Sequence, residues 1–350
     1  KEKVKLDEFM SLFGVGDGGG GPKPENIELG RRLKNLESAP KVTFDTAKNF
    51  FRRLNKKKGN LETWVGELYL ELHRGTLTTH GLVKKQNRKL ENKLKAVEFL
   101  WSCTNLKNYP SSELDASWKK LLINQFHDII PGSSINLVYK TTHKEYNEIH
   151  KTCDDLINKA GSTLFQNHSN SFVLSNALSY HYEDVIEIPK EYSGYGILSE
   201  NGEIIHTQDI NGRLYCKVSL PPLSFTTFRK GGKLKQSANN ASGYVLENEL
   251  IKYTFSNDGT LISALDKETN NGLLDGPGNV LSLYEDRPLN WDAWDIDFYY
   301  KESLLETAKT NKIKQVISGP VLSSLEFHYT VGNSIIKQKI TLGNQSKRLD

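Results

Sequence analysis

The sequence contains little cysteine and no long apolar run. Its 350 residues include only Cys103, Cys153 and Cys216, which lie far apart. This spacing makes neither a disulfide framework nor a metal-binding cluster, and it is typical of a reducing compartment. No stretch approaches the roughly 20 apolar residues that span a membrane. The first residues also lack the apolar segment of a signal peptide. We therefore expect no membrane partner.

An excess of one charge is also missing. Lysine and arginine number 46 against 42 aspartates and glutamates, which leaves a net charge of +4. The lysines are mixed with acidic and amide residues, as in residues 84–93, and this is typical of a solvated helix face. We therefore expect no nucleic-acid partner. A hydrophobic content of 37% allows buried cores, and the length predicts about two or three domains.

The pattern of apolar residues is helical before residue 168. Five helices are predicted. The first begins at Pro24, and the second and third cover Ala47–Leu54 and Leu82–Leu106. The fourth runs from Ser112 towards His127, and the fifth runs from a cap at Ser133 or Ser134 towards Phe165. Two short strands are also predicted, one in residues 3–13 and one in residues 41–44, between the first two helices. The last three helices are long and have short connections, so we expect them to pack as an antiparallel three-helix bundle.

After residue 168 the pattern becomes one of short strands separated by Gly, Pro and Asn. The predicted strands cover residues 171–176, 185–188, 214–220, 225–228, 244–246, 250–255, 261–265 and 334–342. Closely spaced strands with turn signals are typical of β-sandwiches. The predicted fold class is therefore a multidomain α-then-β protein, with a three-helix bundle followed by β-sandwich domains. The predicted boundaries are 39–168 for the helical domain, 169–232 for a small β domain and 243–350 for the start of a larger one.

The most informative motif is His127-Asp128, at the end of a helical pattern and immediately before Pro131-Gly132. A histidine can bind a metal ion, and a neighbouring carboxylate can accept hydrogen bonds from a polyol. The pair lacks the second histidine of the short zinc motifs. From spacing alone, a structural histidine is therefore the favoured alternative.

Asp17 lies in a run of glycines, residues 14–21, which allows three interpretations. A phosphate-binding loop would end in Gly-Lys-Ser/Thr, and that ending is missing. A flexible linker is a second interpretation. In the third, the glycines let the backbone approach a ligand closely while Asp17 projects into the site.

Two further groups of carboxylates suit carbohydrate chemistry. Glu67 and Glu71 share a face if they lie on a helix, and paired carboxylates serve as acid and base in sugar hydrolysis. Ion pairing with nearby arginines is the alternative. The second group lies beside two tryptophans and comprises Asp286, Asp292, Asp295 and Asp297, with Trp291 and Trp294. Aromatic faces beside carboxylates can hold sugar rings; the alternative is an irregular loop with buried tryptophans.

Four motifs in this order resemble those of the family 38 α-mannosidases, in the cytosolic and vacuolar branch. They are residues 16–22, 67–76, 124–134 and 284–295. The resemblance implies that residues 1–38 form the end of a catalytic α/β barrel. It also implies retaining, zinc-dependent removal of terminal α-mannose from mannose-containing oligosaccharides, in the cytoplasm or a vacuole. A homo-oligomer of the full-length protein is expected.

The resemblance also implies roles for individual residues. His127 matches a zinc ligand, and Asp128 matches a carboxylate that holds sugar hydroxyls. Asp17 is the candidate acid/base residue, while Asp292 and Asp295 are expected to edge the same pocket. The family's aspartate nucleophile and its His-x-Asp zinc pair belong to the barrel, and no His-x-Asp occurs in the 350 residues.

We therefore expect a fragment of a larger enzyme, inactive by itself. The alternative is a non-catalytic carbohydrate-binding or assembly module. The two hypotheses differ in whether a barrel with His-x-Asp precedes these residues in the open reading frame.

Overall fold

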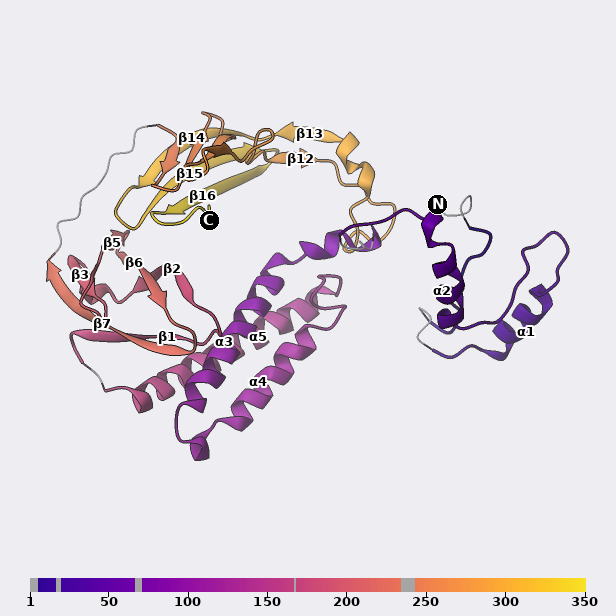
Figure 1. Ribbon diagram of the computed structural model, residues 1–350, viewed down its shortest axis with the longest axis horizontal. Helices are drawn as coiled ribbons and strands as arrows, with labels where there is room; N and C mark the ends of the chain where they lie inside the picture. Colours follow the sequence, from indigo (N-terminus) through magenta and orange to yellow (C-terminus); the bar gives the residue numbers. More distant parts are fainter. Residues whose placement is uncertain (1–5, 17–19, 67–70, 167, 234–242) are drawn as a thin grey trace. The chain divides into compact units, whose positions relative to one another are not determined.

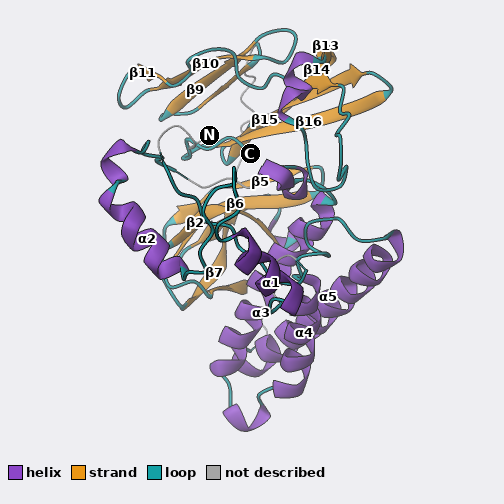
Figure 2. Cartoon of the chain, turned by 90° about the vertical axis from the view of Figure 1, so that its right-hand side faces the viewer, coloured by secondary structure: helices purple, strands orange, loops and turns teal. Residues whose placement is uncertain are grey.

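The computed structural model has two compact units, residues 1–69 and residues 70–350. The described residues are 6–16, 20–66, 71–166, 168–233 and 243–350. Figure 1 labels the helices and strands, and Figure 2 distinguishes helix, strand and loop.

The first unit contains two short helices, α1 (Pro24–Leu33) and α2 (Ala47–Lys56), with a 3-10 turn at Lys58–Asn60. Helix α1 starts with a proline, which suits a position where no N–H is needed. Helix α2 is capped by Thr46, whose Oγ1 accepts a hydrogen bond of 3.3 Å from the backbone N of Asn49. Both helices confirm the prediction from sequence.

The two strands predicted in the first unit are wrong as far as the structure describes them. Residues 6–13 and 41–44 are irregular, and Phe9 and Leu12 are 77% and 79% exposed. A strand is stable only when its backbone pairs with a neighbour. Within the described part of this unit, the sole strand-like pairing is the isolated bridge between Val15 and Gly20.

The second unit begins with 3-10 turns at Glu71–His73 and Gly75–Leu77 and a bundle of α3 (Gly81–Ser102), α4 (Ser111–Asn124) and α5 (Asn136–Leu164). A third 3-10 turn, Leu106–Asn108, joins α3 to α4. Apolar side chains of all three helices form one shared core, which contains Val83, Leu90, Leu94, Val97, Leu121, Tyr146, Ile149 and Leu156. The three-helix bundle is therefore confirmed.

The ends of two bundle helices differ from the prediction. Helix α4 ends at Asn124, so His127 lies beyond it. Helix α5 has Ile135 at its cap position, without a side-chain cap. The serine cap was wrong because the Ser134 hydroxyl donates instead to the backbone O of Asp128, at 2.6 Å. The serine thus stabilises the preceding turn rather than the helix.

The small β domain consists of two antiparallel sheets that face each other across one core. One sheet has the order β1-β7-β3-β4, and the other has the order β2-β6-β5. The strands are β1 (Ser171–Asn176), β2 (Tyr182–Ile188), β3 (Tyr195–Leu198), β4 (Ile204–Ile205), β5 (Thr207–Ile210), β6 (Arg213–Leu220) and β7 (Ser224–Lys233), with a 3-10 turn at Lys190–Tyr192. Alternate residues of β6, from Leu214 to Leu220, are buried, as expected for a half-buried strand.

The large β domain is built of three antiparallel sheets, ordered β11-β10-β9-β8, β14-β15-β16 and β12-β13. The strands are β8 (Val245–Glu247), β9 (Ile251–Phe255), β10 (Leu261–Asp266), β11 (Asn271–Gly272), β12 (Ser282–Tyr284), β13 (Leu304–Thr307), β14 (Lys309–Ile317), β15 (Leu322–Val331) and β16 (Ser334–Gly343). A 3-10 turn covers Phe298–Glu302. The first two sheets share a core that includes Leu246, Ile251, Phe255, Leu325 and Phe327.

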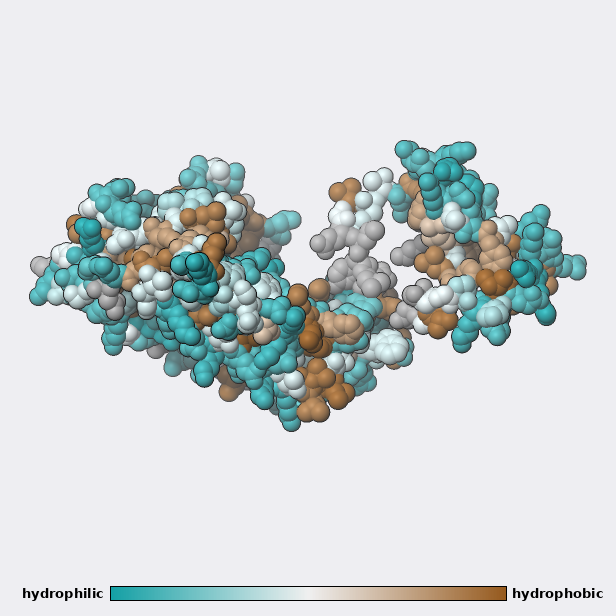
Figure 3. All heavy atoms as spheres, turned by 90° about the horizontal axis from the view of Figure 1, so that it is seen from below, coloured by the Kyte–Doolittle hydropathy of each residue, from teal (hydrophilic) through white to brown (hydrophobic). Residues whose placement is uncertain are grey.

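Large apolar side chains also reach the surface of both units, where Figure 3 shows them in brown. Several lie near the turn between α4 and α5, including Ile123, Phe126 and Ile135. Among the described residues, no helix is long and apolar enough to cross a membrane.

Candidate functional site

His127 and Asp128 lie in a tight turn that follows α4. The carbonyl O of Phe126 accepts hydrogen bonds from the N of Ile129 and the N of Ile130, at 2.8 and 3.1 Å. Nε2 of His127 lies 3.4 Å from Oδ2 of Asp128, and the two side chains are 73% and 49% exposed. The turn therefore presents an imidazole and a carboxylate together to a ligand.

Tyr139, in the first turn of α5, stabilises this turn. Its hydroxyl accepts a hydrogen bond of 2.9 Å from the N of Ser134 and donates one of 3.2 Å to the O of Ile129. The ring of His80 stacks on the ring of Tyr139, with centroids 3.9 Å apart. Because Tyr139 is buried, its hydroxyl fixes both ends of the turn.

Replacing Tyr139 by phenylalanine is expected to destabilise the protein by about 1–2 kcal/mol, because a buried N–H and a carbonyl lose their partner. Urea unfolding measures this difference. Tyr180→Phe is the matched control, since Tyr180 is 61% exposed, and it should change stability by less than about 0.5 kcal/mol. Equal stability of the two variants would contradict the bracing role.

Lys84, in the first turn of α3, joins two loops. Its Nζ donates hydrogen bonds to the backbone O of Thr79 at 2.5 Å, of Ile130 at 2.7 Å and of Pro131 at 3.1 Å. Burial lowers the pKa of the Lys84 amine, because a low-dielectric site disfavours the charged form. The ammonium thus ties the end of residues 126–132, which we call the His127 turn, to the segment before α3.

Gly132 makes the same connection through the backbone. Its φ of +98° is strained for any residue with a side chain, and a Cβ at this position would lie 2.7 Å from the O of Thr79. Only glycine fits this contact, so Gly132 is required to bring the turn against Thr79.

Residues 74–79, which we call the clip, hold the loop of residues 291–297, which we call the Trp–Asp loop. The hydrogen bonds run from Arg74 Nη1 to Ile296 O at 3.0 Å, from Thr76 N to Trp294 O at 3.2 Å, and from Thr79 Oγ1 to Ala293 O at 3.2 Å. Gly75 permits the close approach, because a Cβ there would lie 3.1 Å from the backbone C and O of Trp294. The ring of His73 packs edge-on against that of Trp294, with centroids 4.7 Å apart.

Three motifs singled out in the sequence therefore meet at Thr79. Its hydroxyl contacts the O of Gly75 at 2.7 Å and the Trp–Asp loop, while its carbonyl accepts from Lys84 and lies against Gly132. Sequence reasoning did not find Lys84, Thr79 or Tyr139. Lys84 stands in a run of mixed charges that resembles a solvated helix face, and its acceptors lie up to 47 residues away.

The predicted carboxylates differ in what the structure describes of them. Asp17 and Glu67 lie outside the described residues, as does the side chain of Glu71. Asp292 is exposed. Asp295 is 6% exposed, and its Oδ1 accepts a hydrogen bond of 2.9 Å from the backbone N of Ile296. Of the two Trp–Asp loop candidates, Asp292 is the one whose carboxylate is open to a ligand.

Trp291 is the exposed aromatic surface of the Trp–Asp loop. Its side chain is 67% exposed, and its φ of +61° is uncommon for a non-glycine residue. Asp297 is structural instead: its Oδ2 accepts hydrogen bonds of 2.9 Å from the N of Leu289 and from the hydroxyl of Tyr299. Hydrogen bonds to Asp297 therefore hold one end of the loop, while the Trp291 indole and the Asp292 carboxylate face solvent.

The imidazole of His127 and the carboxylate of Asp128 are suitable donor types for zinc. Protein zinc sites use three or four such donors, and the described residues contain no group of three or more His, Cys, Asp or Glu side chains placed to hold a metal ion. The described part of the chain can thus supply part of a zinc site.

Three family models match consecutive parts of the chain. The glycosyl hydrolases family 38 N-terminal domain matches residues 1–67, the alpha mannosidase middle domain matches residues 71–164, and the glycosyl hydrolases family 38 C-terminal domain matches residues 246–350. The domain boundaries predicted from sequence stay predictions.

Curated relatives match the chain over most of its length. Alpha-mannosidase G of Dictyostelium discoideum is 32% identical over 100% of the chain and 36% of its own length. Alpha-mannosidase 2C1 of Homo sapiens is 31% identical over 87% of the chain and 29% of its own length. The chain thus spans about a third of the length of these relatives.

Two solved structures from Enterococcus faecalis have a similar fold. A glycosyl hydrolase family 38 protein superposes with a TM-score of 0.58 at 15% identity, over 94% of this chain and 49% of that one. An alpha-mannosidase superposes with a TM-score of 0.57 at 16% identity, over 92% and 47%. The arrangement of a helical bundle followed by antiparallel sheets is therefore one that solved structures share.

Proposed function

Because the chain belongs to glycosyl hydrolase family 38, we propose that it is part of an α-mannosidase that removes terminal α-linked mannose from oligosaccharides. The structural observation that carries this proposal is the meeting of the His127 turn and the Trp–Asp loop at Thr79. It joins the turn that carries an exposed imidazole to the loop that carries an exposed indole and carboxylate. The names of the relatives support the same activity.

We propose that His127 contributes one ligand to a zinc ion and that the other ligands come from residues that the structure does not describe. Zinc, when bound, would hold hydroxyls of the mannose ring and stabilise developing charge. The exposure of His127 and its support by Lys84 and Tyr139 favour this role, since a ligand must be both accessible and fixed.

Each of the remaining candidate residues has its own proposed role in binding or cleaving the sugar. Asp128 would accept hydrogen bonds from mannose hydroxyls, and the face of Trp291 would stack on the ring. Asp292 would bind a hydroxyl at the rim of the site. Asp295 stays a predicted edge of the pocket, although its carboxylate is engaged with the backbone. Asp17 stays the candidate that protonates the leaving oxygen of a retaining reaction.

The proposed location is the cytoplasm or a vacuole, and a homo-oligomer is the proposed assembly. Cys103, Cys153 and Cys216 are free thiols, which is compatible with a reducing compartment. Burial raises the pKa of the Cys216 thiol to about 12, so this side chain behaves as an unreactive part of the core.

The experiment is an assay of the full-length protein with a chromogenic α-mannoside, before and after chelation. We expect hydrolysis that a chelator abolishes and zinc restores. NMR should show that the α-anomer of mannose is the first product. Activity that survives complete removal of metal would overturn the zinc role. No hydrolysis by zinc-loaded protein would overturn the enzymatic role in favour of a binding module.

A further inference from the structure

Within the part of the chain that the structure describes, the large β domain contacts the rest of its unit at two separate junctions. The first is the clip, which holds the Trp–Asp loop before α3. The second lies between the two β domains, where the start of β15 meets β5 of the small β domain. The small β domain in turn packs on the bundle, where the ring of Phe225 lies 5.4 Å from that of Phe99.

Gln208, in β5, forms the centre of the second junction. Its Oε1 accepts hydrogen bonds of 2.9 Å from the N of Val321 and from the N of Leu322, and its Nε2 donates one of 3.0 Å to the O of Leu322. The side chain is 5% exposed. One amide group thus replaces a strand neighbour and satisfies three backbone groups of the other domain.

The backbone at this junction is shaped to receive the amide. A Cβ on Gly319 would lie 2.4 Å from Cδ of Gln208, so a side chain at this position would displace the amide. On the other side, Asn344 donates through its N to the O of Val321 at 2.9 Å and through its Nδ2 to the O of Gly319 at 3.0 Å. Asn344 therefore holds the corner of residues 319–322 through hydrogen bonds that do not involve Gln208.

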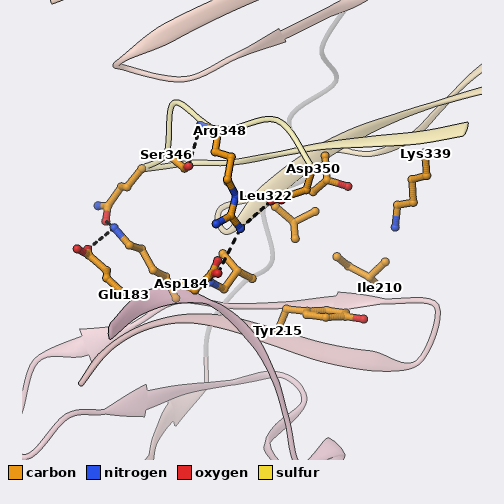
Figure 4. A pocket seen from close by; sticks show the side chains of 14 residues that line it. Glu183, Asp184, Ile210, Tyr215, Leu322, Lys339, Ser346, Arg348 and Asp350 are labelled. Carbon is orange, nitrogen blue, oxygen red and sulfur yellow. Dashed lines mark hydrogen bonds and ion pairs between the residues drawn. The ribbon is translucent and has the colours of Figure 1, made fainter. Parts of the chain in front are cut away.

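A cavity of about 390 Å³ lies between the two β domains, where Leu322 and Tyr215, the strand partner of Gln208, are part of its lining. Figure 4 shows Arg348 reaching across it to Asp184, with Nη2 3.2 Å from Oδ2. Lys217 crosses likewise to Oε1 of Gln345, at 2.8 Å. Arg348 is 62% exposed, and exposed ion pairs add little to stability. The buried amide, rather than these charges, carries the junction.

We propose that Gln208 is a positioning residue for the candidate site, because it fixes the docking of the Trp–Asp loop on the clip from the opposite end of the large β domain. With both junctions closed, each one forms as an intramolecular contact at the high effective concentration that the other provides. Opening either junction therefore raises the fraction of molecules in which the other junction is open, and this coupling is reciprocal.

Hydrogen exchange of the full chain tests the coupling without any substrate. In Gln208→Met, which fills the same space without hydrogen bonds, we expect faster exchange at the N of Val321 and of Leu322. The increase should be on the order of tenfold or more, since two buried N–H groups lose their acceptor. We also expect faster exchange at the N of Thr76 in the clip. The exchange rates of amides in the bundle core, such as that of Leu94, should stay unchanged.

Two further variants keep the test decisive. Lys217→Met is the matched control at the rim of the same junction and should leave the exchange of Thr76 unchanged. Gly75→Ala disturbs the clip and should accelerate exchange at Val321 and Leu322. Unchanged Thr76 in Gln208→Met, or unchanged Val321 and Leu322 in Gly75→Ala, would overturn the coupling.

The consequence for catalysis rests on the proposed function. In the full-length protein, Gln208→Met should raise KM for a mannoside about tenfold or more while kcat changes less, because the Trp–Asp loop binds the sugar without taking part in the chemistry. An equal loss of kcat would overturn the positioning role. An inactive wild-type protein would instead remove the proposed function and leave the exchange result standing.

Discussion

Replacing His127 by alanine is expected to lower kcat/KM of the full-length protein by more than about 100-fold. Loss of residues that only orient metal ligands already costs 10- to 100-fold, and a direct ligand should cost more. The stability of the chain should change by less than about 0.5 kcal/mol, since the side chain is 73% exposed. Kinetics with a chromogenic α-mannoside, together with the zinc content per chain, measure the effect.

The exposed His206 of the small β domain provides the matched control. His206→Ala removes the same imidazole far along the sequence from the candidate site and should leave both zinc content and kcat/KM unchanged. If His127→Ala kept its zinc and its activity, the ligand role would be wrong and the structural interpretation of the histidine would stand.

Lys84→Met is expected to destabilise the protein by about 2–3 kcal/mol. The substitution removes three charge-assisted hydrogen bonds and leaves the carbonyls of Thr79, Ile130 and Pro131 without this donor. Methionine has a similar length, so packing of the alkyl chain is kept. Urea unfolding measures the loss, and zinc affinity should fall with it because the His127 turn is no longer tied to the clip.

Lys85 offers a control in the adjacent position of the same helix. Its side chain is exposed, so Lys85→Met makes the same chemical change with an expected effect below about 0.5 kcal/mol. Equal effects of the two substitutions would show that Lys84 acts only as a surface charge. An intact zinc affinity in Lys84→Met would separate the stability of the bundle from the placement of the turn.

Local patterns in the sequence predicted the elements better than their contacts. The stripe through Leu90, Leu94 and Val97 recurs at helical spacing, and it forms the core of α3. The strand 171–176 was predicted with its observed ends. The strand predicted at residues 41–44 failed because strand formation depends on a partner, which local sequence does not contain.

The candidate site was predictable only in part for the same reason. His127, Asp128 and the Trp–Asp loop stand out by residue type and order. Their support does not, since Arg74 and the Ile296 carbonyl that it binds are 222 residues apart. Lysine and threonine side chains that bind backbone carbonyls carry no distinctive spacing, so Lys84 and Thr79 emerge only from the fold.

The distance along the chain between the clip and its loop also has a consequence for synthesis. Arg74 leaves the ribosome 222 residues before its partner Ile296, which at common elongation rates is an interval of roughly 10 to 45 s. The helical bundle has time to fold in that interval, with the donors of the clip still hydrated. The Trp–Asp loop is therefore synthesised after the bundle, and a nascent chain paused before residue 290 would carry the His127 turn without this loop.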